Sequence, residues 1–132
     1  MALANWKQTI ALNPKHLKAW SNLLAYFDNQ GLNEQVLQTS EVALTFLPND
    51  TNILFSRANV FGKLGNFKTS EMLFKQIISI KPDNALYHAN LGVLYHRFNK
   101  KELALKHYKR ALELDSNLKN ARNNLLKLQS LM

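Results

Sequence analysis

Apolar residues recur every three or four positions along most of this chain, which is the spacing of one face of an α-helix. The pattern is clearest over residues 84–116. Leu91 and Tyr95 lie four residues apart there, and Ala104 and Tyr108 lie four apart in the following segment. Two helices packed face to face satisfy this pattern. One such pair leaves an apolar face without a partner, so similar pairs are expected on both sides.

The same periodicity predicts eight helices joined by short connections, as in antiparallel helix pairs. The expected helices are residues 2–12, 16–29, 32–46, 50–63, 67–80, 84–97, 101–114 and 118–131. Asn49, Asp50 and Asp83 precede two of these helices and are predicted N-caps, because their side chains accept hydrogen bonds from free backbone amides.

Proline recurs at a fixed interval of 34 residues, at Pro14, Pro48 and Pro82, and Ser116 stands where the next would fall. This period is the signature of the tetratricopeptide repeat, a helix–turn–helix unit. With proline at position 32, the repeats are residues 17–50, 51–84 and 85–118. Residues 1–16 then correspond to the second helix of a truncated repeat, and residues 119–132 to a C-terminal capping helix.

Other positions repeat with the same period. Position 11 holds Phe27, Phe61 and Tyr95; position 8 holds Leu24, Ala58 and Gly92; position 24 holds Ser40, Phe74 and Tyr108. The turn at position 15 holds residues that tolerate a left-handed backbone, Gly31, Gly65 and Asn99. The chain therefore resembles the tetratricopeptide family, which implies an all-α solenoid of antiparallel helix pairs wound into a right-handed superhelix.

Two residues depart from the repeat pattern. Arg57 occupies position 7, where the other two repeats have leucine. Burial of an unpaired guanidinium is costly, so its head should either reach solvent or pair with an acid. Ser40 replaces the large residue expected at position 24. The space beside it should be left loosely packed or be filled by Trp20 or Phe46.

The two ends of the array are expected to differ from its middle. Leu3, Trp6 and Ile10 lack the helix that a complete repeat would place against them, which favours a piece of a longer array over self-association through this end. At the other end, Leu125 and Leu126 are predicted to face inward. The other side of that helix should be wet, as a solenoid cap requires. It carries Asn120, Asn123, Asn124 and Lys127.

Composition excludes several functions. The 132 residues contain no cysteine and carry a net charge of +8, with the densest basic run over residues 100–110. That run alternates with apolar residues as the wet face of an amphipathic helix does, and no nucleic-acid-binding motif accompanies it. No apolar run is long enough for a signal peptide or a membrane span.

Catalytic and metal-binding constellations are also absent from the sequence. The histidines, His16, His88, His96 and His107, do not form the i, i+4 pair of a metal-binding helix. His88 stands at a packing position and is predicted to lie in the core. No catalytic residue, no metal ligand and no cofactor site is therefore expected within these residues.

The usable surface of such a solenoid is its concave groove, lined by the first helix of each repeat. Asparagine recurs at groove-facing positions: Asn22, Asn59, Asn90 and Asn124. An asparagine amide donates and accepts, so such a ladder can hold the backbone of an extended peptide. It resembles the asparagine ladder of the cytosolic O-GlcNAc transferase. The alternative is that asparagine at position 6 merely belongs to the repeat consensus.

Four more residues complete the predicted peptide-binding groove. Phe55 is a candidate apolar anchor, and Lys63 and Arg97, with His96 nearby, favour acidic groups on a ligand. The carboxylate clamp of chaperone-binding repeats is disfavoured, because position 5 holds no lysine in any repeat.

Several stretches carry a closer resemblance. Leu47–Asp50, Ala58–Lys63, Tyr87–Arg97 and Lys106–Tyr108 are similar to the C-terminal repeats of the transmembrane and tetratricopeptide-containing O-mannosyltransferases, most of all the fourth paralogue. Leu94–Arg97 is the most specific part.

The resemblance implies a parent enzyme in the endoplasmic-reticulum membrane that transfers mannose to cadherin-type domains. It implies dolichyl-phosphate mannose as donor and leaves a divalent metal open, both in a catalytic half that this chain lacks. The repeats would then face the lumen and bind acceptor proteins, and Asn49, in the sequon Asn49–Thr51, would be a usable N-glycosylation site. The alternative function is a cytosolic scaffold or co-chaperone adaptor.

Overall fold

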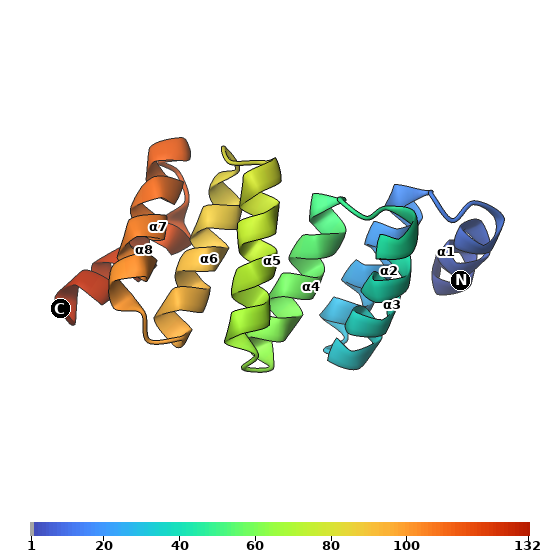
Figure 1. The fold of residues 1–132 in the computed structure, drawn as a ribbon, viewed down its shortest axis with the longest axis horizontal. Coiled ribbons are helices and arrows are strands. Elements are labelled where there is room, and N and C mark those ends of the chain that lie inside the picture. Colours follow the sequence, from blue (N-terminus) through green and yellow to red (C-terminus); the bar gives the residue numbers. More distant parts are fainter. Residues whose placement is uncertain (1) are drawn as a thin grey trace.

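The computed structural model describes residues 2–132, in which eight α-helices and no strand are found. They are α1 (Ala2–Leu12), α2 (Leu17–Asn29), α3 (Asn33–Phe46), α4 (Thr51–Lys63), α5 (Phe67–Ile80), α6 (Ala85–Arg97), α7 (Lys101–Leu114) and α8 (Lys119–Ser130). They stand in one row with the two termini at opposite ends (Figure 1). The prediction of an all-α repeat fold is confirmed, and each helix begins and ends within one residue of its expected bounds.

Side-chain caps fix the starts of α2, α4 and α6. Asp50 and Asn84 each accept a hydrogen bond from the amide three residues further on, at 3.0 and 3.2 Å. His16 does the same through Nδ1 at 3.1 Å. The prediction for Asp50 is confirmed, whereas Asn49 and Asp83 each precede the true cap by one residue. The turn within each pair has the expected left-handed residue, with φ of 71° at Gly31, 81° at Gly65 and 60° at Asn99.

The residues at positions 8 and 24 of the repeat vary inversely in size. In the last repeat the ring of Tyr108 covers Gly92 so closely that a Cβ there would lie 2.7 Å from Tyr108 Cδ1. The corresponding pairs are Leu24 with Ser40 and Ala58 with Phe74. A small residue at one position therefore accompanies a large one at the other. The interface between α6 and α7 is the most extensive in the molecule, and that between α2 and α3 is much smaller.

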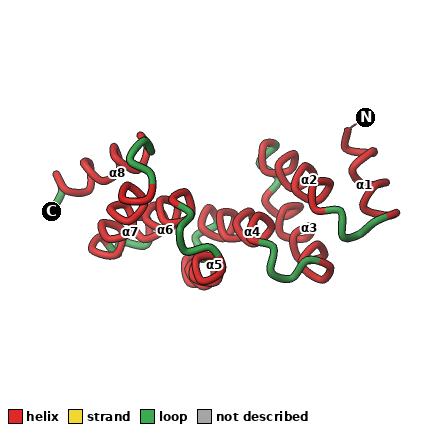
Figure 2. Tube along the Cα trace, turned by 90° about the horizontal axis from the view of Figure 1, so that it is seen from above, coloured by secondary structure: helices red, strands yellow, loops and turns green. Residues whose placement is uncertain are grey.

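The core consists of two apolar clusters that meet at α4. Ile53 and Val60 belong to the N-terminal cluster, with Trp20 and Leu24. Leu54, one residue after Ile53, belongs to the C-terminal cluster. Because α4 buries a face toward each neighbour, it joins the two halves of the row. In Figure 2, α3 and α5 lie on one side of the row and α2 and α8 on the other.

Arg57 lies on α4 and is half-buried, and it does not form the expected pair with an acid among the described residues. Its Nη1 donates to the Leu37 carbonyl oxygen at 2.8 Å and to Ser40 Oγ at 3.0 Å. Its guanidinium carbon also lies 5.2 Å from the centre of the Phe61 ring. The guanidinium is thus directed toward α3, beside the fully buried serine. The small residue at position 24 leaves the room that the arginine head occupies.

The terminal helices are the least buried. No residue of α1 is fully buried. On α8, Leu125 packs against the C-terminal cluster as expected, but Leu126 is 58% exposed and the inward prediction for it is wrong. Ala121 and Leu128 make the buried face instead. No helix within residues 2–132 combines the length and apolar character needed to cross a bilayer.

Candidate peptide-binding groove

Three hollows follow one another along the face formed by α2, α4, α6 and α8, which we call the groove. The N-terminal hollow, between α2 and α4, measures about 180 Å³. Its lining is Ser21, Leu24, Ala25, Asp28, Asn52, Phe55, Ser56 and Asn59. The first helix of each repeat supplies these residues because the second helix packs behind it, against the neighbouring pair.

The middle hollow is narrow, about 40 Å³, and includes Asn59, Asn90 and Arg97. The C-terminal hollow, between α6 and α8, is the largest at about 630 Å³. It is lined by Leu86, Ala89, Asn90, Val93, Asn117, Leu118, Lys119, Asn120, Ala121, Asn123, Asn124 and Lys127. Asn59 belongs to the first two hollows and Asn90 to the last two, so the three form one continuous path.

Three asparagines of the predicted ladder lie along this path. Asn59 and Asn90 each stand where two hollows meet, and Asn124 lines the C-terminal hollow. Asn90 Nδ2 donates to the Leu86 carbonyl oxygen at 2.9 Å, which uses one of its two N–H groups. Its Oδ1 and second N–H remain available to a ligand. Asn22 is half-buried on α2 and lines none of the three hollows.

Phe55 contacts both the groove and the core. It lines the N-terminal hollow, but its ring also packs 5.0 Å from that of Tyr87 and 6.0 Å from that of Phe74, measured between ring centres. The side chain is therefore half-buried and held by the core. A ligand would meet one edge of a fixed ring, which costs little conformational entropy on binding.

The charges of the groove are distributed unevenly. Lys63 lines none of the three hollows, and its Nζ lies 3.0 Å from Asp28 Oδ1, so its charge is already paired. Both side chains are almost half exposed, which makes this a surface pair of small energetic value. Arg97 is exposed beside the middle hollow and forms no ion pair with another described residue. His96 is half-buried and lines none of the three hollows.

Asn120, Asn123 and Lys127 were interpreted from the sequence only as the wet side of a cap, yet all three line the C-terminal hollow. The signal was present, because they occupy positions 2, 5 and 9 of the repeat numbering, which face the groove in complete repeats. A solvating cap and a binding surface use the same polar residues. Only the position of α8 opposite α6 distinguishes them.

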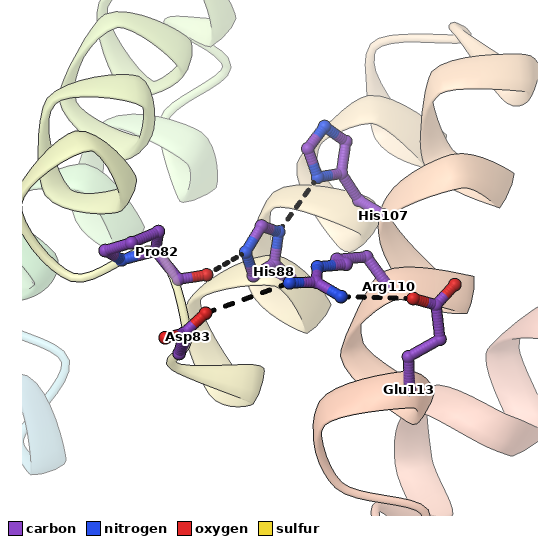
Figure 3. Close-up of polar contacts among 6 residues, drawn as sticks. All are labelled: Pro82, Asp83, His88, His107, Arg110 and Glu113. Carbon is purple, nitrogen blue, oxygen red and sulfur yellow. Dashed lines mark hydrogen bonds and ion pairs between the residues drawn. The ribbon is translucent and has the colours of Figure 1, made fainter.

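A separate polar cluster ties α6 to α7 and to the loop before α6 (Figure 3). His88 Nε2 lies 2.8 Å from the Pro82 carbonyl oxygen, and His88 Nδ1 lies 3.3 Å from His107 Nδ1. A carbonyl only accepts, so His88 carries its proton on Nε2 and accepts from His107 through Nδ1. Trp20 makes the equivalent bond to Pro14 at 2.6 Å, so position 4 anchors the preceding loop in both repeats.

The prediction that His88 lies in the core is confirmed, since it is 6% exposed. Burial lowers the pKa of His107 from 6.5 to about 4, and electrostatic interactions with His88, Lys106 and Lys75 lower it further. Arg110, on the same helix, pairs with Asp83 at 3.8 Å and with Glu113 at 3.1 Å. These contacts hold α6, α7 and the loop before α6 together in the last repeat. Among residues 2–132, no group of three or more ligating side chains could hold a metal ion.

The sequon at Asn49 lies in the loop between α3 and α4. The Asn49 side chain is exposed, but Thr51 opens α4 and is only 4% exposed. Asp50 between them is the N-cap. The acceptor nitrogen is thus accessible in the folded chain, whereas the threonine hydroxyl that completes the sequon is not.

Two family models, both described as the tetratricopeptide repeat, match consecutive segments, residues 51–84 and 85–118. Solved structures agree: MamA superposes with a TM-score of 0.84 at 10% identity, over 97% of this chain and 75% of that one. The first repeat domain of Spaghetti (RPAP3), bound to an HSP90 peptide, gives 0.82 at 21% identity, over 89% and 93%. The chain belongs to the tetratricopeptide-repeat family.

Its curated relatives are O-mannosyltransferases. It is 36% identical over 95 residues to protein O-mannosyl-transferase F38B6.6 of Caenorhabditis elegans, which covers 72% of this chain and 14% of that protein. Human protein O-mannosyl-transferase TMTC3 is 29% identical over 94 residues, covering 70% and 10%. Human TMTC4 is 48% identical over 40 residues, covering 30% and 5%. The resemblance seen in the sequence is confirmed, and the chain spans only a small part of each relative.

Proposed function

We propose that this chain is a protein-recognition module that holds an extended peptide segment in its groove. The observation that carries the proposal is the continuous path of three hollows with Asn59 and Asn90 at their junctions. Amide side chains spaced along an open path suit the repeating donors and acceptors of a peptide backbone. Structures similar in fold include repeat domains with bound or bindable peptides, which supports this class of ligand.

The test is a triple substitution of Asn59, Asn90 and Asn124 by alanine. Each lines the path, and none caps a helix or belongs to the core. Binding to an acceptor domain, measured by titration calorimetry, should weaken by at least about tenfold, since each of the three lost hydrogen bonds contributes about 0.5–1.5 kcal/mol. The melting temperature should change little. A matched control replaces the exposed residues Asn5, Gln35 and Gln76, which lie on α1, α3 and α5. Equal affinities in both triple variants would end the proposal.

The finer proposal is that the acceptor is a cadherin-type domain and that the chain is the luminal recognition part of an endoplasmic-reticulum O-mannosyltransferase. The relatives support the enzyme class. The catalytic half and its dolichyl-phosphate mannose donor would lie outside this chain. The binding partner in the calorimetry is accordingly a cadherin-type domain, with an unrelated β-sandwich domain as control. Equal binding to both domains would contradict a preference for cadherin-type domains, but the proposal of a protein-recognition module would stand.

The compartment can be tested independently through Asn49. Secretory expression should add one glycan, which disappears in the Asn49→Gln variant. Because Thr51 is buried in the folded state, the modification should occur on the nascent chain and occupancy should be partial. The secreted chain could instead carry no glycan at Asn49 while a second, engineered sequon is glycosylated normally. That result would remove the support for a location in the lumen. A cytosolic scaffold would then be the better-supported function.

A further inference from the structure

The C-terminal hollow differs from the other two in both size and charge. At about 630 Å³ it exceeds the N-terminal hollow, about 180 Å³, and the middle hollow, about 40 Å³. Helix α2 contacts α4 and α4 contacts α6, but α6 makes no comparable contact with α8. The groove is therefore widest at this end.

Its charges have one sign. Lys119 and Lys127 belong to the lining, and no aspartate or glutamate does. Arg97 lies in the adjoining middle hollow, which shares Asn90 and Val93 with this one. At the other end of the groove, Asp28 pairs with Lys63 and removes the excess positive charge. A ligand carboxylate is thus attracted to the C-terminal end in particular.

The neutral part of the lining identifies the rest of the ligand. Asparagines from α6, from α8 and from the loop before α8 line the hollow, and they offer donors and acceptors to a backbone. Leu86, half exposed, provides one apolar wall. No aromatic side chain lines the hollow, so a nucleic-acid base would find no ring to stack on.

We propose that this hollow is the principal subsite of the groove and that its occupant is an extended peptide segment bearing an internal aspartate or glutamate. The carboxylate lies between Lys127 and Arg97, and the flanking backbone follows the asparagines past Asn90. The inference rests on the proposed groove function and adds the chemical class of the bound segment. It uses α8, which the sequence presents as a cap.

The test uses four dye-labelled octapeptides and fluorescence anisotropy. The main probe alternates aspartate with glycine and has an amidated C-terminus, and its counterpart has asparagine in place of aspartate. A third peptide is the asparagine version with a free C-terminal carboxylate, and a fourth alternates lysine with glycine. At low salt the aspartate peptide should bind about tenfold tighter than its asparagine counterpart and lose most of that advantage above about 0.3 M salt.

The matched variants are Lys127→Glu and Lys109→Glu. Both lysines are exposed and both changes alter the net charge equally, but Lys109 lies on α7, away from the hollow. Lys127→Glu should weaken the aspartate peptide by about tenfold and Lys109→Glu by less than about twofold, because screened attraction falls with distance. Circular dichroism melts should be alike in both variants.

Three results would overturn the inference. If Lys127→Glu and Lys109→Glu lost the same affinity, the aspartate peptide would be attracted to the basic chain in general and not to this hollow. Equal binding of the aspartate and asparagine peptides would remove the acid preference. A free-carboxylate peptide that binds as tightly as the aspartate peptide would make the ligand a chain terminus. In each case an intact effect of the asparagine triple variant on acceptor binding would leave the proposed function standing, so the two failures are distinguishable.

Discussion

Arg57 on α4 and Ser40 on α3 are joined by a hydrogen bond of 3.0 Å across 17 residues of sequence. Both are departures from the repeat pattern, and each accounts for the other. The serine leaves space at position 24, and the arginine head enters it and also bonds the Leu37 carbonyl oxygen. Neither residue is explained by its own repeat, because the contact crosses from one repeat to the next.

A double-mutant cycle tests this relationship. Arg57→Leu leaves the Ser40 hydroxyl with fewer partners and should lower the free energy of unfolding by about 1–2 kcal/mol. Ser40→Ala should cost about 1 kcal/mol, since the guanidinium loses one acceptor. The double variant should lose less than the sum, because the polar partners disappear together. Urea denaturation gives all three values. Strict additivity would show that the two side chains do not stabilise one another.

The contact of Gly92 with Tyr108 predicts a steric penalty. An alanine Cβ at Gly92 would lie 2.7–2.8 Å from two ring carbons, so either the Tyr108 ring or the two helices must shift. Gly92→Ala should destabilise by about 1–3 kcal/mol in thermal or urea unfolding.

Gly62→Ala is its control. That Cβ would lie 3.4 Å from its nearest neighbours, which is ordinary contact, and alanine favours a helix over glycine by up to about 1 kcal/mol. The variant should be as stable as the parent or more so. If the two substitutions had the same effect, the close approach of Tyr108 would not be the cause.

The histidine cluster predicts a loss of stability in acid. The pKa of His107 is lowered from 6.5 to about 4, so between these values the unfolded chain binds the extra proton and the folded chain does not. Stability should therefore fall as pH drops from about 6.5 toward 4, by about 1–2 kcal/mol from this residue after allowance for solvent screening. His107→Gln should flatten that part of the profile. Urea midpoints at pH 7 and 4.5 measure it, and unchanged pH dependence in the variant would contradict the assignment.

The pair between Asp28 and Lys63 predicts a gain of affinity when it is broken. Asp28→Asn removes the one acid that lines the N-terminal hollow and leaves the charge of neighbouring Lys63 unpaired, while an exposed pair contributes only about 0–1 kcal/mol to stability. Binding of the aspartate–glycine peptide should tighten by about twofold to fivefold at low salt. Glu41→Gln, at an exposed residue of α3 that forms no ion pair with a described residue and lines no hollow of the groove, makes the same charge change as a control. An equal gain in both variants would assign the effect to net charge.

The sequence by itself determined the eight helices of residues 2–132, their pairing and the first-helix positions that line the groove. Proline spacing and small residues at fixed positions suffice for this, because each helix pair packs by local contacts that recur with the period. The left-handed turns at Gly31, Gly65 and Asn99 follow from the same local rules. The asparagines at groove-facing positions could be predicted for the same reason.

Only the tertiary structure decided which of these residues act together. Arg57 meets Ser40, and Lys63 meets Asp28, through contacts 17 and 35 residues apart in sequence. The width of the C-terminal hollow depends on how far α8 stands from α6, which no pattern within one helix encodes. Hydrophobic periodicity fixes which side of a helix is buried. It leaves open the distances between helices, because these depend on the summed side-chain volumes of both partners.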